Sequence, residues 1–153
     1  MILHKTCMKE DNMNYSISQT AKRIGVTAYT LRYYDKEGLL PFVDRTPSGI
    51  RSFKESDFEW LAVVNCLKNT GMSIKQIKVF IDYCLEGDAT LEKRLDVFTQ
   101  QKASVEKQIE ELQTYLKKIE YKIWYYQTAV AAGTEAVHAK GKSELEYEKN
   151  SQN

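Results

Sequence analysis

The feature of this sequence that most constrains its fold is a long apolar repeat in the second half of the chain. From Leu91 to Val130, positions at alternating steps of four and three residues are apolar in eleven of twelve cases. This spacing predicts a helix about 60 Å long with a continuous apolar stripe along one side. We call this stripe the seam, and its positions are Leu91, Leu95, Phe98, Lys102, Val105, Ile109, Leu112, Leu116, Ile119, Ile123, Tyr126 and Val130.

A seam of this length needs a partner helix of similar length, because the small remainder of the chain cannot bury it. No other segment of the sequence carries such a repeat. We therefore expect a coiled-coil homodimer, in which the same helix of a second copy covers the seam. Lys102 is the single polar residue of the seam. It can fix the register of the two helices, or its stem can pack while its ammonium group reaches solvent.

Two short helices are expected near the start of the patterned sequence. Ser16 and Gln19 match a capping box for a helix that ends at Gly25. Thr27 caps a second helix that runs to about Glu37. Two such helices, joined by a few residues around a glycine, are typical of a helix-turn-helix.

A short irregular segment follows. Residues 40–43 and 50–53 have the composition of strands, and the residues between them are rich in turn formers. This pattern predicts a β-hairpin with an exposed basic turn. Two further helices are expected over 56–70 and 73–86. Their expected buried side chains are Trp60, Val63, Val64 and Leu67 on the first, and Ile74, Ile77, Ile81 and Leu85 on the second.

These elements predict a mainly α fold: a winged helix-turn-helix head with a small β-hairpin wing, followed by a long dimerisation coiled-coil helix. The head spans 14–86 and the dimerisation helix spans 87–130. A flexible N-terminal tail at 1–13 and a polar C-terminal tail at 131–153 flank them. In such a head the second helix can enter the major groove of DNA, and the hairpin can lie along the neighbouring backbone.

The overall charge gives no sign of a nucleic-acid partner. Lys and Arg number 22 against 21 Asp and Glu, for a net charge of +1. Residues 14–72 hold eight basic and six acidic side chains, a local charge of +2. Any contact with DNA must therefore come from where the cations lie rather than from a general positive field.

The cysteines and the hydropathy of the chain indicate the cellular compartment. Three widely spaced cysteines, Cys7, Cys66 and Cys84, favour a reducing cytoplasm over a disulfide framework. No apolar run is long enough to cross a bilayer or to act as a signal peptide. We therefore expect a cytoplasmic protein that has no membrane partner.

Three stretches of the sequence resemble the DNA-binding half of the mercury-resistance-type (MerR) transcription regulators. They are Tyr15-Ser-Ile-Ser, then Thr27-Ala-Tyr-Thr-Leu-Arg-Tyr-Tyr-Asp-Lys-Glu-Gly-Leu-Leu-Pro, and Ser48-Gly-Ile-Arg-Ser-Phe. The resemblance covers about residues 14–127. It implies a sequence-specific regulator whose long helices pair antiparallel. It also implies that the dimer bends and untwists a promoter with an over-long spacer so that RNA polymerase can engage it.

Four residues in or beside the second helix are candidates for DNA contact. Tyr29, Arg32 and Tyr33 share one helix face, and Thr27 lies at the amino end. Arginine can form paired hydrogen bonds with phosphate or a guanine edge, and tyrosine hydroxyls can donate to phosphate. The resemblance adds Tyr34 to this set. The alternative for Tyr33 and Tyr34 is that they are core aromatics.

Three basic residues outside this helix complete the candidate DNA-binding site. The resemblance implies that Arg51 is the arginine of the wing and that Lys68 reaches phosphate. Arg45 lies nearer the turn of the hairpin. For Arg45 and Lys68, the alternative is a solvated surface charge.

Cys66 is a candidate sensing thiol, which an electrophile could attack or an oxidant could modify. The segment from Glu59 to Ser73, which contains Cys66, resembles the MerR branch that responds to aldehydes, other electrophiles or nitrosative stress. The alternative is that Cys66 is a small buried hydrophobe. For Cys84 a structural role is favoured.

The sequence does not support an enzyme, a metal site or a cofactor. Residues 127–153 contain no cysteine and one histidine, His138, whereas a zinc site needs three or four ligands. The paired-cysteine loop that metal-responsive relatives carry after the long helix is therefore missing here. The sequence also shows no phosphate loop and no Ser/His/Asp arrangement. The alternative function is a coiled-coil adaptor whose small helical head binds other proteins.

Overall fold

The structure is a computed structural model that describes residues 14–138 and Tyr147. The chain divides into two compact units, residues 1–101 and 102–153. The tail expected at 1–13 lies outside the described residues, as do 139–146 and 148–153.

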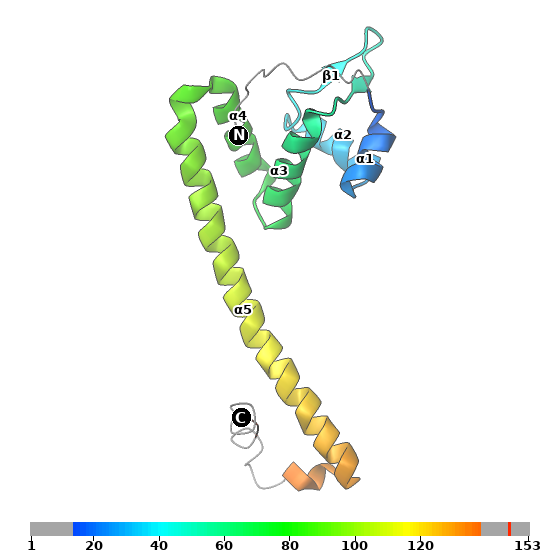
Figure 1. Cartoon of the computed structure of the whole chain (residues 1–153), viewed down its shortest axis with the longest axis vertical. Helices are drawn as coiled ribbons and strands as arrows, with labels where there is room; N and C mark the ends of the chain where they lie inside the picture. Colours follow the sequence, from blue (N-terminus) through cyan, green and yellow to red (C-terminus); the bar gives the residue numbers. More distant parts are fainter. Residues whose placement is uncertain (1–13, 139–146, 148–153) are drawn as a thin grey trace. The chain divides into compact units, whose positions relative to one another are not determined.

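The first two helices form the expected helix-turn-helix. They are α1 (Ile17–Ile24) and α2 (Ala28–Lys36), which lie next to each other in Figure 1. Ser16 and Gln19 form the predicted capping box, and Gly25 ends α1 in a left-handed conformation with φ 72°. Thr27 caps α2, because its hydroxyl oxygen accepts a hydrogen bond from the backbone N–H of Thr30 at 3.0 Å. Local capping signals therefore set the bounds of both helices.

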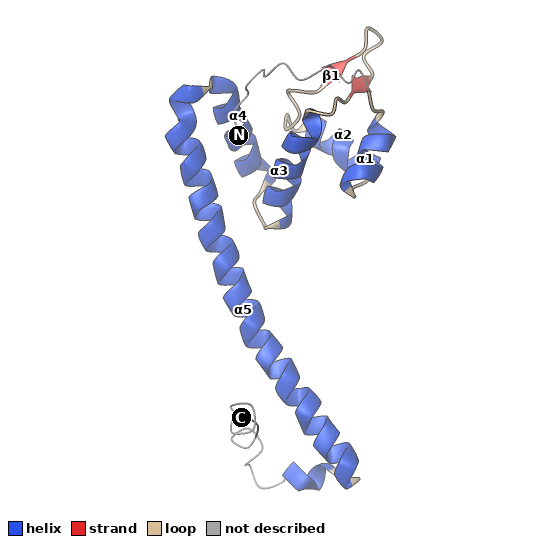
Figure 2. Cartoon of the chain, viewed as in Figure 1, coloured by secondary structure: helices blue, strands red, loops and turns tan. Residues whose placement is uncertain are grey.

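The wing is a two-stranded antiparallel hairpin, drawn in red in Figure 2. Its strands are β1 (Asp44–Arg45) and β2 (Arg51–Ser52), with Arg45 opposite Arg51. The prediction of a first strand over 40–43 is wrong. Leu40 is buried in the core, and the chain turns over residues 41–42. Burial of the apolar residues holds this segment against the head, so the strand forms only beyond them.

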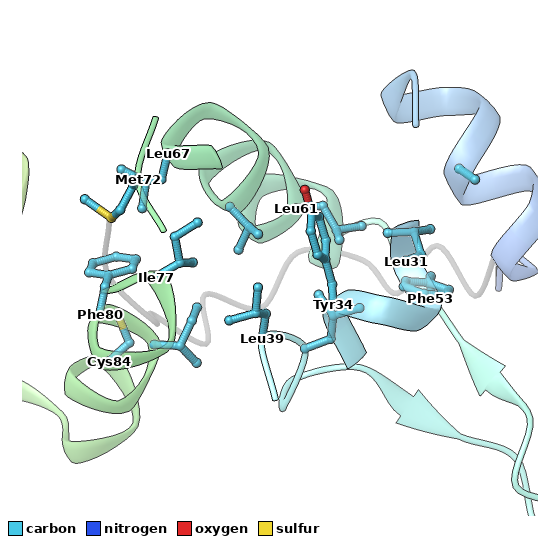
Figure 3. Close-up of a cluster of buried hydrophobic side chains, with 14 residues drawn as sticks. Leu31, Tyr34, Leu39, Phe53, Leu61, Leu67, Met72, Ile77, Phe80 and Cys84 are labelled. Carbon is cyan, nitrogen blue, oxygen red and sulfur yellow. The ribbon is translucent and has the colours of Figure 1, made fainter. Parts of the chain in front are cut away.

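Two longer helices, α3 (Asp57–Asn69) and α4 (Ile74–Glu86), complete the core of the head. Figure 3 shows this core, in which Leu31, Leu39, Phe53, Leu61, Leu67 and Ile77 are almost fully buried. The prediction that Leu85 is buried is wrong, since it is 63% exposed. Cys84 is buried in its place, because it lies seven residues after Ile77 and so returns to the same helix face.

The long helix α5 (Leu91–Ala132) has 42 residues and follows a short 3-10 turn, η1 (Asp88–Thr90). The apolar side chains of the seam that lie beyond residue 105 are exposed in the single chain. Lys102 is also exposed, and its ammonium group lies 3.0 Å from the carboxylate of Glu106 one turn further along. The predicted helix is thus present, and its apolar face is uncovered.

The first residues of the expected C-terminal tail adopt a regular structure, which a polar tail does not predict. Gly133 adopts a positive φ of 69°, and a second 3-10 turn, η2 (Glu135–His138), follows. The His138 ring stacks on Tyr125 with ring centroids 3.9 Å apart. Its Nε2 atom lies 2.7 Å from the hydroxyl oxygen of Thr128. These contacts pack η2 against the last turns of α5, which the polar composition of this segment does not reveal.

None of the helices within the described ranges combines the length and the apolar character needed to cross a membrane.

The buried core predicts a specific stability change. Leu61→Ala should lower the free energy of unfolding by about 3 kcal/mol, because it leaves a cavity among fully buried side chains. Glu59→Ala on the exposed face of α3 is the control, with an expected change within about 0.5 kcal/mol. Chemical denaturation at one fixed protein concentration measures both. Equal effects of the two substitutions would contradict the described core.

Candidate nucleic-acid interface

The exposed face of α2 carries three of the predicted contact residues. Tyr29 is 77% exposed and Tyr33 is 40% exposed, and Arg32 between them is exposed as well. The opposite face of this helix is anchored in the core by Leu31. The helix therefore presents two tyrosine rings and a guanidinium group to solvent on a fixed base. This arrangement can donate hydrogen bonds to phosphates or to base edges.

Tyr34 lies on the other side of the helix. Only 4% of it is exposed, and it packs among Leu31, Leu61 and neighbouring residues in Figure 3. Burial raises the pKa of its phenol. A ring enclosed in this way has little surface for a phosphate, so the structure favours the core alternative over DNA contact for Tyr34.

Thr27 sits at the amino end of α2, where its hydroxyl already caps the helix. The hydroxyl oxygens of Thr27 and Thr30 also lie 2.8 Å apart. Thr27 is exposed, so the structure places it at the edge of the face that carries Tyr29 and Arg32.

The two wing arginines share one carboxylate, which no sequence motif predicts. Nη2 of Arg45 lies 2.8 Å from Oδ2 of Asp35, and Nη2 of Arg51 pairs with the same oxygen. Nη1 of Arg45 also donates to the carbonyl of Gly49 at 3.2 Å. The structure therefore brings the predicted Arg45 and Arg51 together, with Asp35 of α2 between them. No local pattern could have revealed this pair, since the partners lie 10 and 16 residues apart.

Some other cations of the head pair with carboxylates. Arg23 pairs with Glu55 and Lys54 pairs with Asp44. The hydrogen bond from Arg23 also lowers the pKa of the Glu55 carboxyl.

Within the described part of the chain, Arg32 and Lys68 take part in none of the ion pairs. Lys68 is exposed near the end of α3. Lys22, Lys36 and Lys75 of the head are likewise exposed and outside these ion pairs, so Arg32 and Lys68 are two of five such cations among residues 14–86.

The two cysteines of the described residues differ in exposure. Cys66 is exposed on α3, whereas Cys84 is buried in the core. Burial raises the pKa of the Cys84 thiol, against the smaller opposing effect of Arg94. The structure contradicts the interpretation of Cys66 as a buried hydrophobe, and its sensing role stays a prediction. Among the residues whose placement is described, no group of three or more His, Cys, Asp or Glu could hold a metal ion.

Comparison with known proteins places this architecture in a family. The family profile of the MerR HTH family regulatory protein matches residues 15–84. An uncharacterised HTH-type transcriptional regulator of Haemophilus influenzae is 50% identical over 122 residues, which are 80% of this chain and 90% of the relative. The HTH-type transcriptional regulator AdhR of Bacillus subtilis is 40% identical over 87 residues, which are 57% of this chain and 62% of the relative.

Two solved structures share the fold. The crystal structure of HiNmlR, a MerR family regulator lacking the sensor domain, was obtained with promoter DNA bound. It matches with a TM-score of 0.76 at 49% identity, over 82% of this chain and 99% of HiNmlR. A MerR family regulator from Bacillus thuringiensis matches with a TM-score of 0.68 at 47% identity, over 72% of this chain and 97% of that one. With a winged helix-turn-helix head, a long helix and relatives of this similarity, the chain belongs to the MerR family of helix-turn-helix transcriptional regulators.

Proposed function

We propose that this regulator binds double-stranded promoter DNA as a homodimer and controls transcription by distorting that DNA. The observation that carries the proposal is the exposed face of α2, where Arg32 stands between Tyr29 and Tyr33 without a carboxylate partner among the described residues. The crystal structure of HiNmlR with promoter DNA, at 49% identity, supports it.

In this proposal α2 enters the major groove and the wing lies along the adjacent backbone. Arg32 forms hydrogen bonds with a phosphate or a guanine edge, and the tyrosine hydroxyls donate to phosphates. Arg45, Arg51 and Lys68 contact the backbone. Because the net charge is only +1, affinity comes from these placed contacts and not from a general field.

The exposed seam of α5 supports the homodimer. A second copy of the same helix would cover its apolar side chains and would hold two heads at a fixed separation. The resemblance to the family adds antiparallel pairing. It also adds an activated state that bends and untwists a promoter with an over-long spacer, so that RNA polymerase engages both promoter elements. Such a distortion costs on the order of several kcal/mol, offset by backbone contacts.

The DNA contact of Arg32 is directly testable. Arg32→Ala should weaken binding by about 1–3 kcal/mol, since it removes the unpaired guanidinium of the α2 face. Fluorescence anisotropy measures this loss on a duplex that the wild-type protein selects from a random pool. Lys107→Ala, which removes an exposed cation of α5, is the control and should bind normally. Unchanged binding by Arg32→Ala would count against α2 as the groove-reading helix, whereas a wild-type protein that selects no duplex would favour the adaptor with a protein-binding head.

The seam makes a prediction about assembly. Leu112→Lys should shift the protein to a monomer in light scattering, because dimerisation would bury a cation from each copy in an apolar interface. DNA affinity should fall with it. Glu111→Lys places the same charge on the neighbouring residue off the seam and should leave the dimer intact. A wild-type protein that is monomeric at working concentration would refute the homodimer.

The exposed thiol makes a prediction about signalling. Cys66→Ser should abolish induction of a reporter promoter by aldehydes or thiol oxidants and leave basal DNA binding unchanged, because a hydroxyl is a far weaker nucleophile than a thiolate. Cys84→Ser is the control and should still respond, since the Cys84 thiol is buried. Normal induction in Cys66→Ser would mean that Cys66 is no sensor.

A further inference from the structure

We propose that Asp35 is a positioning residue for DNA binding: it holds Arg45 and Arg51 in the place from which the wing meets the DNA backbone. This inference deepens the proposed function and rests on it. Asp35 itself is an anion and would not contact phosphate directly. Its role would be exerted through the two arginines that share its carboxylate.

The geometry of the pair ties the wing to α2. A single carboxylate oxygen of Asp35 accepts from Nη2 of both arginines. Arg45 donates in addition to the carbonyl of Gly49 at the far end of the hairpin loop. One side chain of α2 is thus connected to both strands of the wing and, through Arg45, to its turn.

Apart from the Asp35 pair, the wing is held where β2 ends, since the buried Phe53 pairs with the backbone of Tyr15. Each of its strands is only two residues long. A hairpin of this size is marginal without outside contacts. By contrast, α2 is anchored in the core by Leu31 and Tyr34, which lie on either side of the exposed Arg32 and Tyr33 in sequence. A carboxylate on α2 therefore transfers the rigidity of the head to the wing.

Burial makes the carboxylate necessary for this arrangement. The side chain of Asp35 is 14% exposed and that of Arg51 is 23% exposed. The Nε atom of Arg51 is buried without a hydrogen-bond partner. A guanidinium group in such a place is destabilised if its carboxylate is removed, so Arg51 would have to swing out and move the wing. With Asp35 present, the group of three keeps one net positive charge that can attract a phosphate.

The direction in which DNA affinity changes when Asp35 is replaced distinguishes positioning from simple charge neutralisation. Removal of a carboxylate near DNA ordinarily raises affinity, because it removes repulsion from phosphates. Glu37→Gln tests that effect: Glu37 follows the last residue of α2 and joins no ion pair among residues 14–138. It should bind as tightly as wild type or tighter. Asp35→Asn, although it also removes one negative charge, should bind on the order of tenfold more weakly.

Two further measurements distinguish positioning of the wing from a role of Asp35 in stability alone. In Asp35→Asn, the slope of log affinity against log salt should fall by about 0.9 for each wing phosphate contact that is lost. Arg45→Ala should also cost much less affinity in the Asp35→Asn background than in wild type, because both changes act through the same contact. Thermal unfolding at equal concentration checks that all variants are folded.

A measurement on the unaltered protein covers the case in which Asp35→Asn fails to fold. The side-chain Nε–H of Arg51, buried in the free protein, should give a nuclear magnetic resonance signal protected from solvent exchange. Protection that persists when the selected duplex binds supports positioning in the complex. Loss of protection on binding would show that the pair opens and would overturn the inference.

The outcomes also distinguish this inference from the proposed function. A wild-type protein that selects no duplex would refute both the proposed function and the role of Asp35. A wild-type protein that binds, together with a folded Asp35→Asn that binds equally or more tightly, would overturn the role of Asp35 alone. The role of Asp35 would also be overturned if Arg45→Ala cost as much DNA affinity in the Asp35→Asn background as in wild type.

Discussion

Exposed apolar side chains along α5 are the constraint on which the rest of the molecule depends. The helix has 42 residues, and eleven of the twelve seam positions are apolar. Burial of one Leu-sized side chain contributes about 1.5–3 kcal/mol. Even half of that at each of the apolar positions of two copies, about 16–33 kcal/mol in all, exceeds the roughly 4–15 kcal/mol that association costs in lost freedom. The seam is therefore the surface through which the proposed homodimer would form.

Lys102 shows how a seam can remain selective. Its ammonium group pairs with Glu106 in the single chain, so its charge has a partner on the same helix before any second copy arrives. A cation inside an otherwise apolar seam penalises registers that would bury it without a partner. Both of the roles expected from the sequence, register and solvation, are compatible with this ion pair.

Features set by neighbours in sequence could be predicted, and features set by distant partners could not. The capping box of Ser16 and Gln19 acts within one turn, so the bounds of α1 were evident from the sequence. The exposed Tyr29 and Arg32 followed from helix periodicity. The strand predicted over 40–43 and the burial predicted for Leu85 were wrong, because packing against other elements decided them.

The candidate site divides in the same way. The identity of its arginines and exposed tyrosines could be predicted from the sequence. The shared carboxylate of Asp35 could not, because its partners approach only once the hairpin has folded beside α2. The burial of Tyr34 depended equally on contacts from α3, such as that with Leu61, which helix periodicity alone does not fix. The sequence does not decide between core and surface for Cys66, because this residue lies at the shoulder of the apolar stripe on α3.

The pairing of charges in the head connects the two halves of the proposed function. Carboxylates neutralise Arg23 and Lys54, and Asp35 reduces two wing cations to one net charge. Residues 14–72 carry a net charge of only +2, so nonspecific binding of a single head to phosphates is weak at physiological salt. Tight binding then requires that two heads engage one duplex together, since linkage raises the effective concentration of the second. The seam would thus supply affinity as well as assembly, and a fixed separation of the heads would favour DNA that can be bent to match it.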